Sequence, residues 1–281
     1  MLRSSNPILS KKDAFTPAAP QYGQQYGQQY QGYPTQGGFG GPQDPYATAP
    51  APSAPAGQGR MTLDDVITKT AVTIGLLVVT AGLAWNFVPD SLSFPALILS
   101  ALVGFGVVLL VSFRRVVSPP LVLLYAGIEG VFIGMISKVY ESFYSGIVAQ
   151  AVVATFVAAG VTLAAYKFFN IRVTAKFTKV VVISTIAFAG LMLINFIFSL
   201  ATGSTGLRGG ITGPVSGLSI LISAVAIVLA VLNLVLDFDY VERGVEMGAP
   251  ANESWRAAFG LTVTMVWLYI ELLRLISYLR R

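Results

Sequence analysis

The sequence predicts an all-α membrane protein, a bundle of seven transmembrane helices preceded by a polar N-terminal tail. Hydrophobic residues make up 54% of the 281 residues and charged residues only 11%, whereas charged residues form about a quarter of an average soluble domain. After residue 65 the chain contains seven apolar runs, each near the roughly 20 residues that a helix needs to cross a bilayer. We therefore divide the chain into a tail, residues 1–60, and one membrane domain, residues 61–281.

The apolar runs place the seven helices to within about two to four residues at each end. Thr62 is suited to cap the first helix, and Asp64 and Asp65 in its first turn complement the helix dipole. The predicted spans are residues 66–88, 94–113, 119–139, 146–168, 179–201, 215–237 and 256–279.

The tail is rich in Gln, Gly, Pro and Ala and has almost no aliphatic side chains, so it cannot form a packed core. Its Tyr22, Tyr26 and Tyr30 recur every fourth residue, but the interspersed glycines and prolines disfavour a helix. We expect a disordered cytoplasmic tail, with weak self-association or docking as the functional alternative. The first apolar run starts beyond residue 65, so no signal peptide is expected.

The composition excludes several kinds of chemistry. The chain has no Cys and no His, which excludes disulfides, thiolate nucleophiles, Cys/His zinc sites and Ser–His hydrolysis. Asp237 is not part of a Tyr-Asp pair and no Gly-x-Gly-Asp sequence occurs, which disfavours an intramembrane aspartyl protease; the last span also lacks a lysine for a retinal Schiff base. We expect neither enzymatic activity nor a cofactor.

The basic residues predict the orientation of the domain. The net charge of +5 is attributed to loops on the cytoplasmic side, and not to a nucleic-acid surface. This assignment predicts a multi-pass plasma-membrane protein whose N-terminus lies in the cytoplasm. Seven spans put the C-terminus outside, but Arg280 and Arg281 oppose this placement, so a re-entrant or tilted last segment remains an alternative. The basic residues on the side of the N-terminus are Arg60, Lys69, Arg114, Arg115, Lys167, Arg172, Lys176, Lys179, Arg243 and Arg256; Lys138 and Arg208 lie on the other side.

The third span carries a stripe of small residues, Ala126, Gly130 and Gly134, at intervals of four. Such a stripe lets a neighbouring helix approach closely. Glu129 lies beside it near the middle of the span, where an acid has to face the bundle interior, a cavity or a partner. It has either a functional role or a structural hydrogen bond, for example to Tyr125 or to an asparagine such as Asn195 or Asn233.

Three further acids, Asp237, Asp239 and Glu271, lie in or beside the last two spans. Carboxylates in apolar surroundings are costly unless they are paired, hydrated or protonated, and they often mark function. Arg274 follows Glu271 by three residues and is suited to neutralise it on the same helix face. The alternatives are solvation at a helix end for Asp237 and Asp239, and a purely structural ion pair for Glu271 and Arg274.

Helix rise predicts the depth of these acids. If the sixth helix continues to a turn at residues 248–252, Asp237 lies roughly 15 Å from that turn and Glu271 roughly 26 Å from it. Glu129, counted from Pro119 on the same side, also lies at roughly 15 Å. Asp237 can therefore pair with Glu271 or with Glu129. Two carboxylates in contact share one proton, and when ionised the three acids could bind Ca²⁺ transiently.

The Gly-rich segment of residues 202–214 joins the fifth and sixth spans. It has no phosphate-binding Lys-Ser/Thr pair at the required spacing. We expect a flexible extracellular loop.

The segments DFDYVERGVEMGAP and WLYIELLRL, together with the third span around Glu129, resemble the Bax-inhibitor-like transmembrane family, in particular its bacterial branch. The resemblance covers about residues 61–281 and leaves the tail outside. It implies a seven-helix fold in which the last helix is central and surrounded by the other six.

The resemblance further implies a pH-sensitive calcium leak controlled by two acids, one on each of the last two helices. These correspond to Asp237 and Glu271, although Glu271 replaces the usual Asp and is farther along the chain than the family pattern implies. Ca²⁺ or protons are then the permeant or regulatory ions. The alternative is a non-conducting regulator that binds a membrane protease or another membrane complex.

Overall fold

The computed structural model describes residues 59–281 except 115, 205, 213 and 214, and this part is built from seven long α-helices. All seven are long and apolar enough to cross a membrane, which confirms the all-α, seven-span prediction. The predicted tail lies outside the described residues, apart from Gly59 and Arg60. The helices are α1 (Leu63–Phe87), α2 (Asp90–Phe113), α3 (Pro119–Phe143), α4 (Ile147–Phe168), α5 (Ala175–Thr202), α6 (Gly217–Glu246) and α7 (Glu253–Leu279), with a short 3₁₀ helix, η1 (Gly206–Arg208), between α5 and α6.

Local sequence signals explain where several helices begin. The side chains of Thr62, Thr174 and Ser216 cap α1, α5 and α6, each accepting a hydrogen bond from a backbone N–H in the first turn. These bonds satisfy amides that have no partner within the helix. α3 begins with Pro119, where the missing N–H costs nothing, and α5 ends at Gly203, whose φ of 67° suits glycine.

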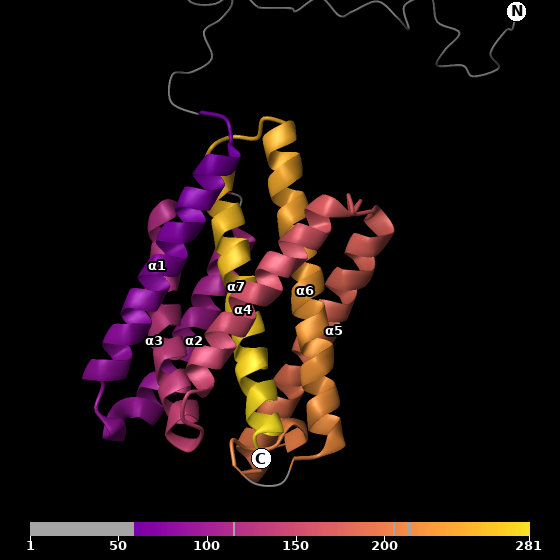
Figure 1. Cartoon of the computed structure of the whole chain (residues 1–281). Helices are drawn as coiled ribbons and strands as arrows, with labels where there is room; N and C mark the ends of the chain where they lie inside the picture. Colours follow the sequence, from indigo (N-terminus) through magenta and orange to yellow (C-terminus); the bar gives the residue numbers. More distant parts are fainter. Residues whose placement is uncertain (1–58, 115, 205, 213–214) are drawn as a thin grey trace, which may run out of the picture. The chain divides into compact units, whose positions relative to one another are not determined.

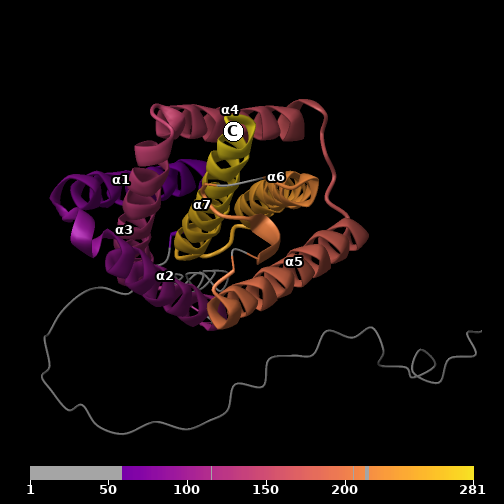
Figure 2. The same cartoon turned by 90° about the horizontal axis from the view of Figure 1, so that it is seen from below.

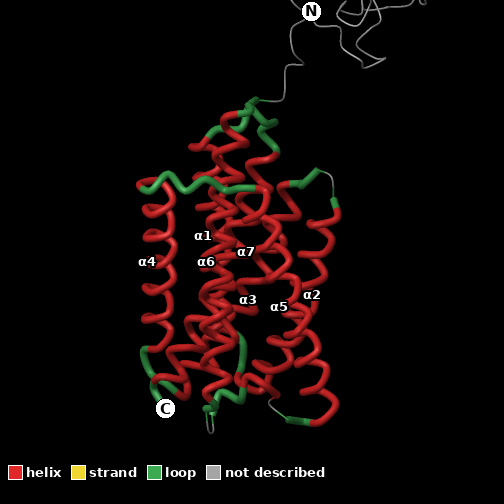
Figure 3. Tube along the Cα trace, turned by 90° about the vertical axis from the view of Figure 1, so that its right-hand side faces the viewer, coloured by secondary structure: helices red, strands yellow, loops and turns green. Residues whose placement is uncertain are grey.

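The described bundle has two ends, which we name by the links between helices. The proximal end carries the start of α1 and the α2–α3, α4–α5 and α6–α7 links. The distal end carries the α1–α2, α3–α4 and α5–α6 links and the end of α7, as Figures 1 and 3 show. α7 is a continuous helix between the two ends and not a re-entrant segment, so the C-terminal residues lie at the distal end.

α7 is the central helix. It packs against α1, α3, α4 and α6, and in the view along the bundle it lies inside a ring formed by the other helices (Figure 2). Side chains extend these contacts, because Phe259 packs edge-on against Tyr125 of α3 and Trp267 stacks on Phe188 of α5. The central position implied for the last helix is therefore present.

The outer faces of the helices are apolar. On α5 only Val181 is buried along the described length, while large side chains such as Phe94 of α2 and Ile194 of α5 are about 70% exposed. Surfaces of this kind are suited to contact with lipid chains. An apolar groove of about 450 Å³ between α1 and α4 also reaches Met265 and Tyr269 of α7, so the ring around α7 is not complete.

The stripe of Ala126, Gly130 and Gly134 lies against α1. A Cβ atom at Gly130 would overlap Thr80 and the carbonyl of Leu77, and one at Gly134 would overlap the backbone of Ala81. Ala126 is fully buried in the same cluster. The absent side chains therefore let α1 and α3 approach at backbone distance.

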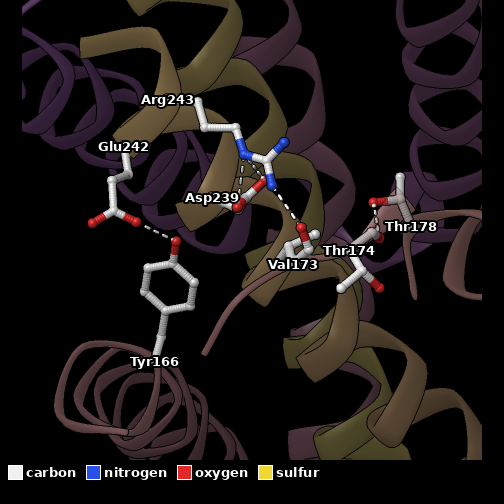
Figure 4. Close-up of polar contacts among 7 residues, drawn as sticks. All are labelled: Tyr166, Val173, Thr174, Thr178, Asp239, Glu242 and Arg243. Carbon is white, nitrogen blue, oxygen red and sulfur yellow. Dashed lines mark hydrogen bonds and ion pairs between the residues drawn. The ribbon is translucent and has the colours of Figure 1, made fainter. Parts of the chain in front are cut away.

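α6 continues to Glu246, well beyond the predicted end at residue 237. The extension is polar and is held by the α4–α5 region (Figure 4): Arg243 forms an ion pair of 2.9 Å with Asp239 and donates a hydrogen bond of 2.6 Å to the carbonyl of Val173, while the Tyr166 hydroxyl donates to Glu242. The hydropathy pattern predicted too short a helix, because it ends where the charged residues begin. These charges lie where a helix can leave the hydrocarbon layer.

The segment before α1 is attached to the α6–α7 turn. The Met61 N–H donates to the Ala249 carbonyl at 2.7 Å, and the Ala251 N–H donates to the Gly59 carbonyl at 2.8 Å. Lys69 of α1 adds a hydrogen bond of 3.0 Å to the Ala251 carbonyl. The position of the α6–α7 turn is therefore linked to the root of the N-terminal tail.

The α1–α3 contact gives a direct test of helix packing. We expect Gly130→Ala to destabilise the protein by about 1–3 kcal/mol, because the added methyl group overlaps α1. Gly127→Ala on the same helix is the matched control, since a Cβ there meets nothing within 4 Å. Thermal unfolding in detergent should show a lower Tm for the first variant only; equal Tm values would contradict the packing.

Candidate functional site

The structure separates the acids that the sequence suggested as a common site. Asp237 contacts Thr264, whereas Glu271 lies seven residues beyond Thr264 on α7 and contacts Arg208. Seven residues are about 10 Å of helix, or two turns, so Asp237 and Glu271 do not pair. Asp237 and Glu129 share no hydrogen bond in the described part of the chain, and Glu129 is not part of the cavity wall that contains Asp237. Neither of the two pairings expected from the sequence is present.

Asp237 is held between α6 and the central helix. The Thr264 hydroxyl donates a hydrogen bond of 2.7 Å to Oδ2 of Asp237. Oδ1 lies 3.3 Å from the position that a Cβ at Gly260 would occupy, and Gly260 is one helical turn before Thr264. A small residue and a hydroxyl on one face of α7 therefore create the space and the donor for this carboxylate.

Asp237 lines a cavity of about 340 Å³ at the proximal end, between α2, α6 and α7. Polar groups of Ser112, Tyr240 and Arg256 share the lining with it. Glu253 accepts a hydrogen bond of 2.6 Å from the Tyr240 hydroxyl and forms an ion pair of 2.8 Å with Arg256. A carboxylate in the membrane domain thus lies at the wall of a cavity whose other polar groups belong to the proximal end.

Glu129 lies on α3 and faces α2. Its Oε2 is 2.9 Å from the position that a Cβ at Gly104 would occupy, so the glycine leaves room for the carboxylate. Glu129 is half-buried and makes no hydrogen bond or ion pair with the described residues. The asparagines considered as partners are engaged elsewhere, because Asn233 donates to Thr185 and Asn195 accepts from the Leu207 N–H.

Glu271 is the most buried of these acids. Its side chain is 3% exposed and lies 2.8 Å from the guanidinium of Arg208, which is 11% exposed. Arg208 comes from η1 in the link between α5 and α6, and its guanidinium also lies 5.5 Å from the Phe188 ring. A loop residue therefore supplies the counter-ion of an acid on the central helix.

The two remaining candidates, Arg274 and Asp239, do not contact Glu271 or Asp237 in the way the sequence suggested. Arg274, the expected partner of Glu271, is in electrostatic range of Glu271, Tyr140 and Tyr278 but forms no ion pair with Glu271. Asp239 pairs with Arg243 at the proximal end of α6, away from the Thr264 site. The interfacial alternative for Asp239 therefore describes its place better than the ion-pathway alternative.

The acids also do not form a metal centre. Within the described part of the chain, no three acidic side chains lie close enough together to hold a metal ion. The expected transient Ca²⁺ site of Asp237, Glu129 and Glu271 is not assembled here, because the three side chains lie on different helices or at different depths.

The link between α5 and α6 differs from the flexible loop that its glycines suggested. Residues 206–211 are folded and bonded to the helices around them. Gly206 and Gly209 have φ angles of 61° and 66°, which glycine adopts without strain. A Cβ at Gly206 would also overlap Asn195. These two glycines therefore allow a compact turn, which the composition of the segment did not predict.

Sequence reasoning missed Thr264 and Arg208, the two residues that contact Asp237 and Glu271. Thr264 carried a weak signal, since Gly260 and Thr264 place a small residue and a polar residue one turn apart on α7. Arg208 carried a stronger one, because it is the single charged residue in the segment of residues 202–214.

Six apolar helices around a central seventh, with acids held inside, define a multi-pass integral membrane protein. Comparison with protein-family models identifies its family: residues 6–281 match the family described as Bax inhibitor 1 like. The chain belongs to this family. The match begins at residue 6 and so includes most of the tail that we expected to lie outside the resemblance. A search of the curated proteins finds no match.

The Asp237–Thr264 contact can be tested by its stability. We expect Thr264→Val to destabilise the protein by about 1–3 kcal/mol, because a half-buried carboxylate loses its only hydrogen-bond donor among the described residues. Thr264→Ser retains the hydroxyl and should keep most of the stability. Unfolding in detergent measures the difference, and an equal loss for Ser and Val would show that the methyl group, not the hydroxyl, matters.

Proposed function

We propose that the protein is a cation leak pathway, with Ca²⁺ as the expected permeant ion, and that Asp237 is the acid that controls it. The observation that supports this most is the position of Asp237, which lies in the wall of a proximal cavity and is fixed to the central helix by Thr264. A carboxylate oxygen is a preferred ligand of Ca²⁺. Acids inside a membrane bundle commonly belong to ion paths.

The basic residues support an orientation for this pathway. Lys167, Arg172, Lys176 and Arg243 belong to the proximal links or the helix ends beside them. By the positive-inside tendency, the proximal cavity then faces the cytoplasm and the distal end faces outward, as in a plasma-membrane protein. The N-terminal tail, whose root is bound to the α6–α7 turn, is cytoplasmic in this orientation.

Glu129 is a second element of the proposed pathway. By helix rise it lies at about the same depth as Asp237, but on α3 and facing α2. Because it has no partner among the described residues, a hydrated cation that passed Asp237 would find a second oxygen ligand at this level. The two carboxylates act separately in this proposal and do not share a proton.

The proposed pH response follows from Asp237 alone, because Asp237 lines the proximal cavity and Glu129 does not. Thr264, not a second acid, faces Asp237 on α7. An ionised Asp237 attracts cations and a protonated one does not, so flux should rise with pH. A shared proton between two coupled acids would give two apparent steps, whereas an isolated acid gives one.

The contact of Asp237 with Thr264, in place of a second acid, favours a second candidate function. This candidate is a non-conducting regulator that binds a membrane protease or another membrane complex. Without a carboxylate pair, the gating mechanism that the resemblance implies lacks one of its two acids. Cross-linking in native membranes followed by co-purification tests this candidate. If no partner protein stays bound after mild detergent extraction, the result would count against it.

The conduction proposal predicts the effect of Asp237→Asn on Ca²⁺ flux. In liposomes with the purified full chain, we expect a fall of about tenfold or more, because the variant removes the charge that concentrates cations in the cavity. The flux of the unaltered protein should rise with pH in one step, and the variant should lose this step. A fluorescent Ca²⁺ indicator inside the liposomes measures both.

Asp239→Asn is the matched control, since Asp239 lies two residues away on the same helix but pairs with Arg243 at the surface. It should leave the flux and its pH dependence nearly unchanged. A flux that does not respond to pH or to Asp237→Asn would refute the proposal, as would equal effects of the two variants.

A further inference from the structure

The distal end of the bundle is covered by residues 206–211, which we call the distal cap. Its backbone is bonded to several elements at once: the Tyr278 hydroxyl of α7 donates to the Arg208 carbonyl at 2.5 Å, and Ser219 of α6 donates to the Leu207 carbonyl at 3.1 Å. Asn195 of α5 accepts from the Leu207 N–H at 2.7 Å, and Tyr144, after α3, donates to the Ile211 carbonyl at 3.2 Å.

These contacts show that the distal cap bridges helices from both sides of the bundle. The backbone of α5 contacts α6 and η1, so the cap is part of what fixes α5. Figure 1 shows this segment at the distal end, beside the C-terminal end of α7. The cap is therefore a folded element across the end of the bundle.

The side chain of Arg208 projects from the cap into the bundle. Its ion pair with Glu271 is 2.8 Å long and almost fully buried. The pair is only partly satisfied, because Nε and Nη2 of Arg208 and Oε2 of Glu271 are buried without a hydrogen-bond partner in the described part of the chain. A buried ion pair with unsatisfied groups is weak evidence for a gain in stability, which leaves room for a functional role.

The charge around this pair is positive. Arg274 also lies in electrostatic range of Glu271, and its Nε is buried without a hydrogen-bond partner among the described residues. Two guanidinium groups therefore face one carboxylate in a region where water does not screen charge well. Arginine in a narrow membrane passage forms an electrostatic barrier to cations.

We propose that the distal cap closes the cation pathway and that Arg208 is the residue that excludes cations at this end. This inference rests on the proposed function, since it assigns the distal barrier of the same pathway. Asp237 attracts cations at the proximal end, and Arg208 repels them at the distal end. Conduction then requires the Arg208 guanidinium to leave Glu271.

The first experiment measures Ca²⁺ flux in liposomes that contain the full chain. Arg208→Gln should raise the flux by about tenfold or more, since the barrier charge is removed. Arg208→Lys keeps the charge and should stay close to the unaltered protein. Arg280→Gln, at the same end but bonded to the Ser145 carbonyl, is the matched control and should have no effect.

Folding is controlled by a second variant. Arg208→Gln leaves Glu271 buried without its counter-ion, whereas Arg208→Gln combined with Glu271→Gln leaves a neutral pair of similar size. The double variant should fold with nearly unaltered Tm and still leak more than the unaltered protein. If Arg208→Gln and the double variant conduct no more than the unaltered protein, while Asp237→Asn still lowers its flux, the distal barrier is wrong and the proposed function stands.

The second experiment does not depend on ion flux. The chain has no cysteine, so Thr264→Cys introduces a single thiol beside Asp237. A membrane-impermeant thiol reagent added on the distal side should label it only when Arg208→Gln is also present. The proposed closure is wrong if Thr264→Cys is labelled equally with and without Arg208→Gln, or if neither of these two proteins is labelled. This conclusion holds even if Asp237→Asn shows no effect on flux.

Discussion

The buried carboxylate of Glu271 on the central helix is the constraint on which the distal half of the structure depends. A charge in that position cannot reach water, so the protein itself has to supply a counter-ion. The counter-ion comes from Arg208, and this requires the α5–α6 link to fold back over the end of α7. The tight glycine turns, the bond from Tyr278 and the contact of η1 with α5 belong to the same folded link.

The helices themselves could be predicted from the sequence because a membrane sets their length. Each apolar run gave a helix, and the observed ends differ from the predicted ones by a few residues for all but α6. α6 continues to Glu246 because its polar extension is bonded to Tyr166 and Val173, which lie far away in the sequence. Hydropathy does not record such contacts. The central place of α7 followed from the family resemblance.

The site was predicted less completely, for a geometric reason. Helix rise gave the depth of each acid, and it correctly separated Asp237 from Glu271 by about two turns. Depth alone does not give the rotation of a helix about its axis, and this decides that Asp237 faces Thr264 while Glu129 faces Gly104. The partner of Glu271 was beyond reach because Arg208 lies in a loop whose composition suggests flexibility.

The two ends of the interior therefore differ in charge, and this difference bears on mechanism. The proximal cavity exposes one carboxylate, Asp237, held by an uncharged donor; the distal end holds Glu271 among the guanidinium groups of Arg208 and Arg274. In the proposed pathway, a cation would be attracted from the proximal side and would be prevented from leaving on the distal side. Because α7 carries both Thr264 and Glu271, a shift of this one helix would alter the Asp237 contact and the Arg208 contact together. In the proposed pathway, coupling through the central helix would take the place of the paired carboxylates as the physical basis for gating.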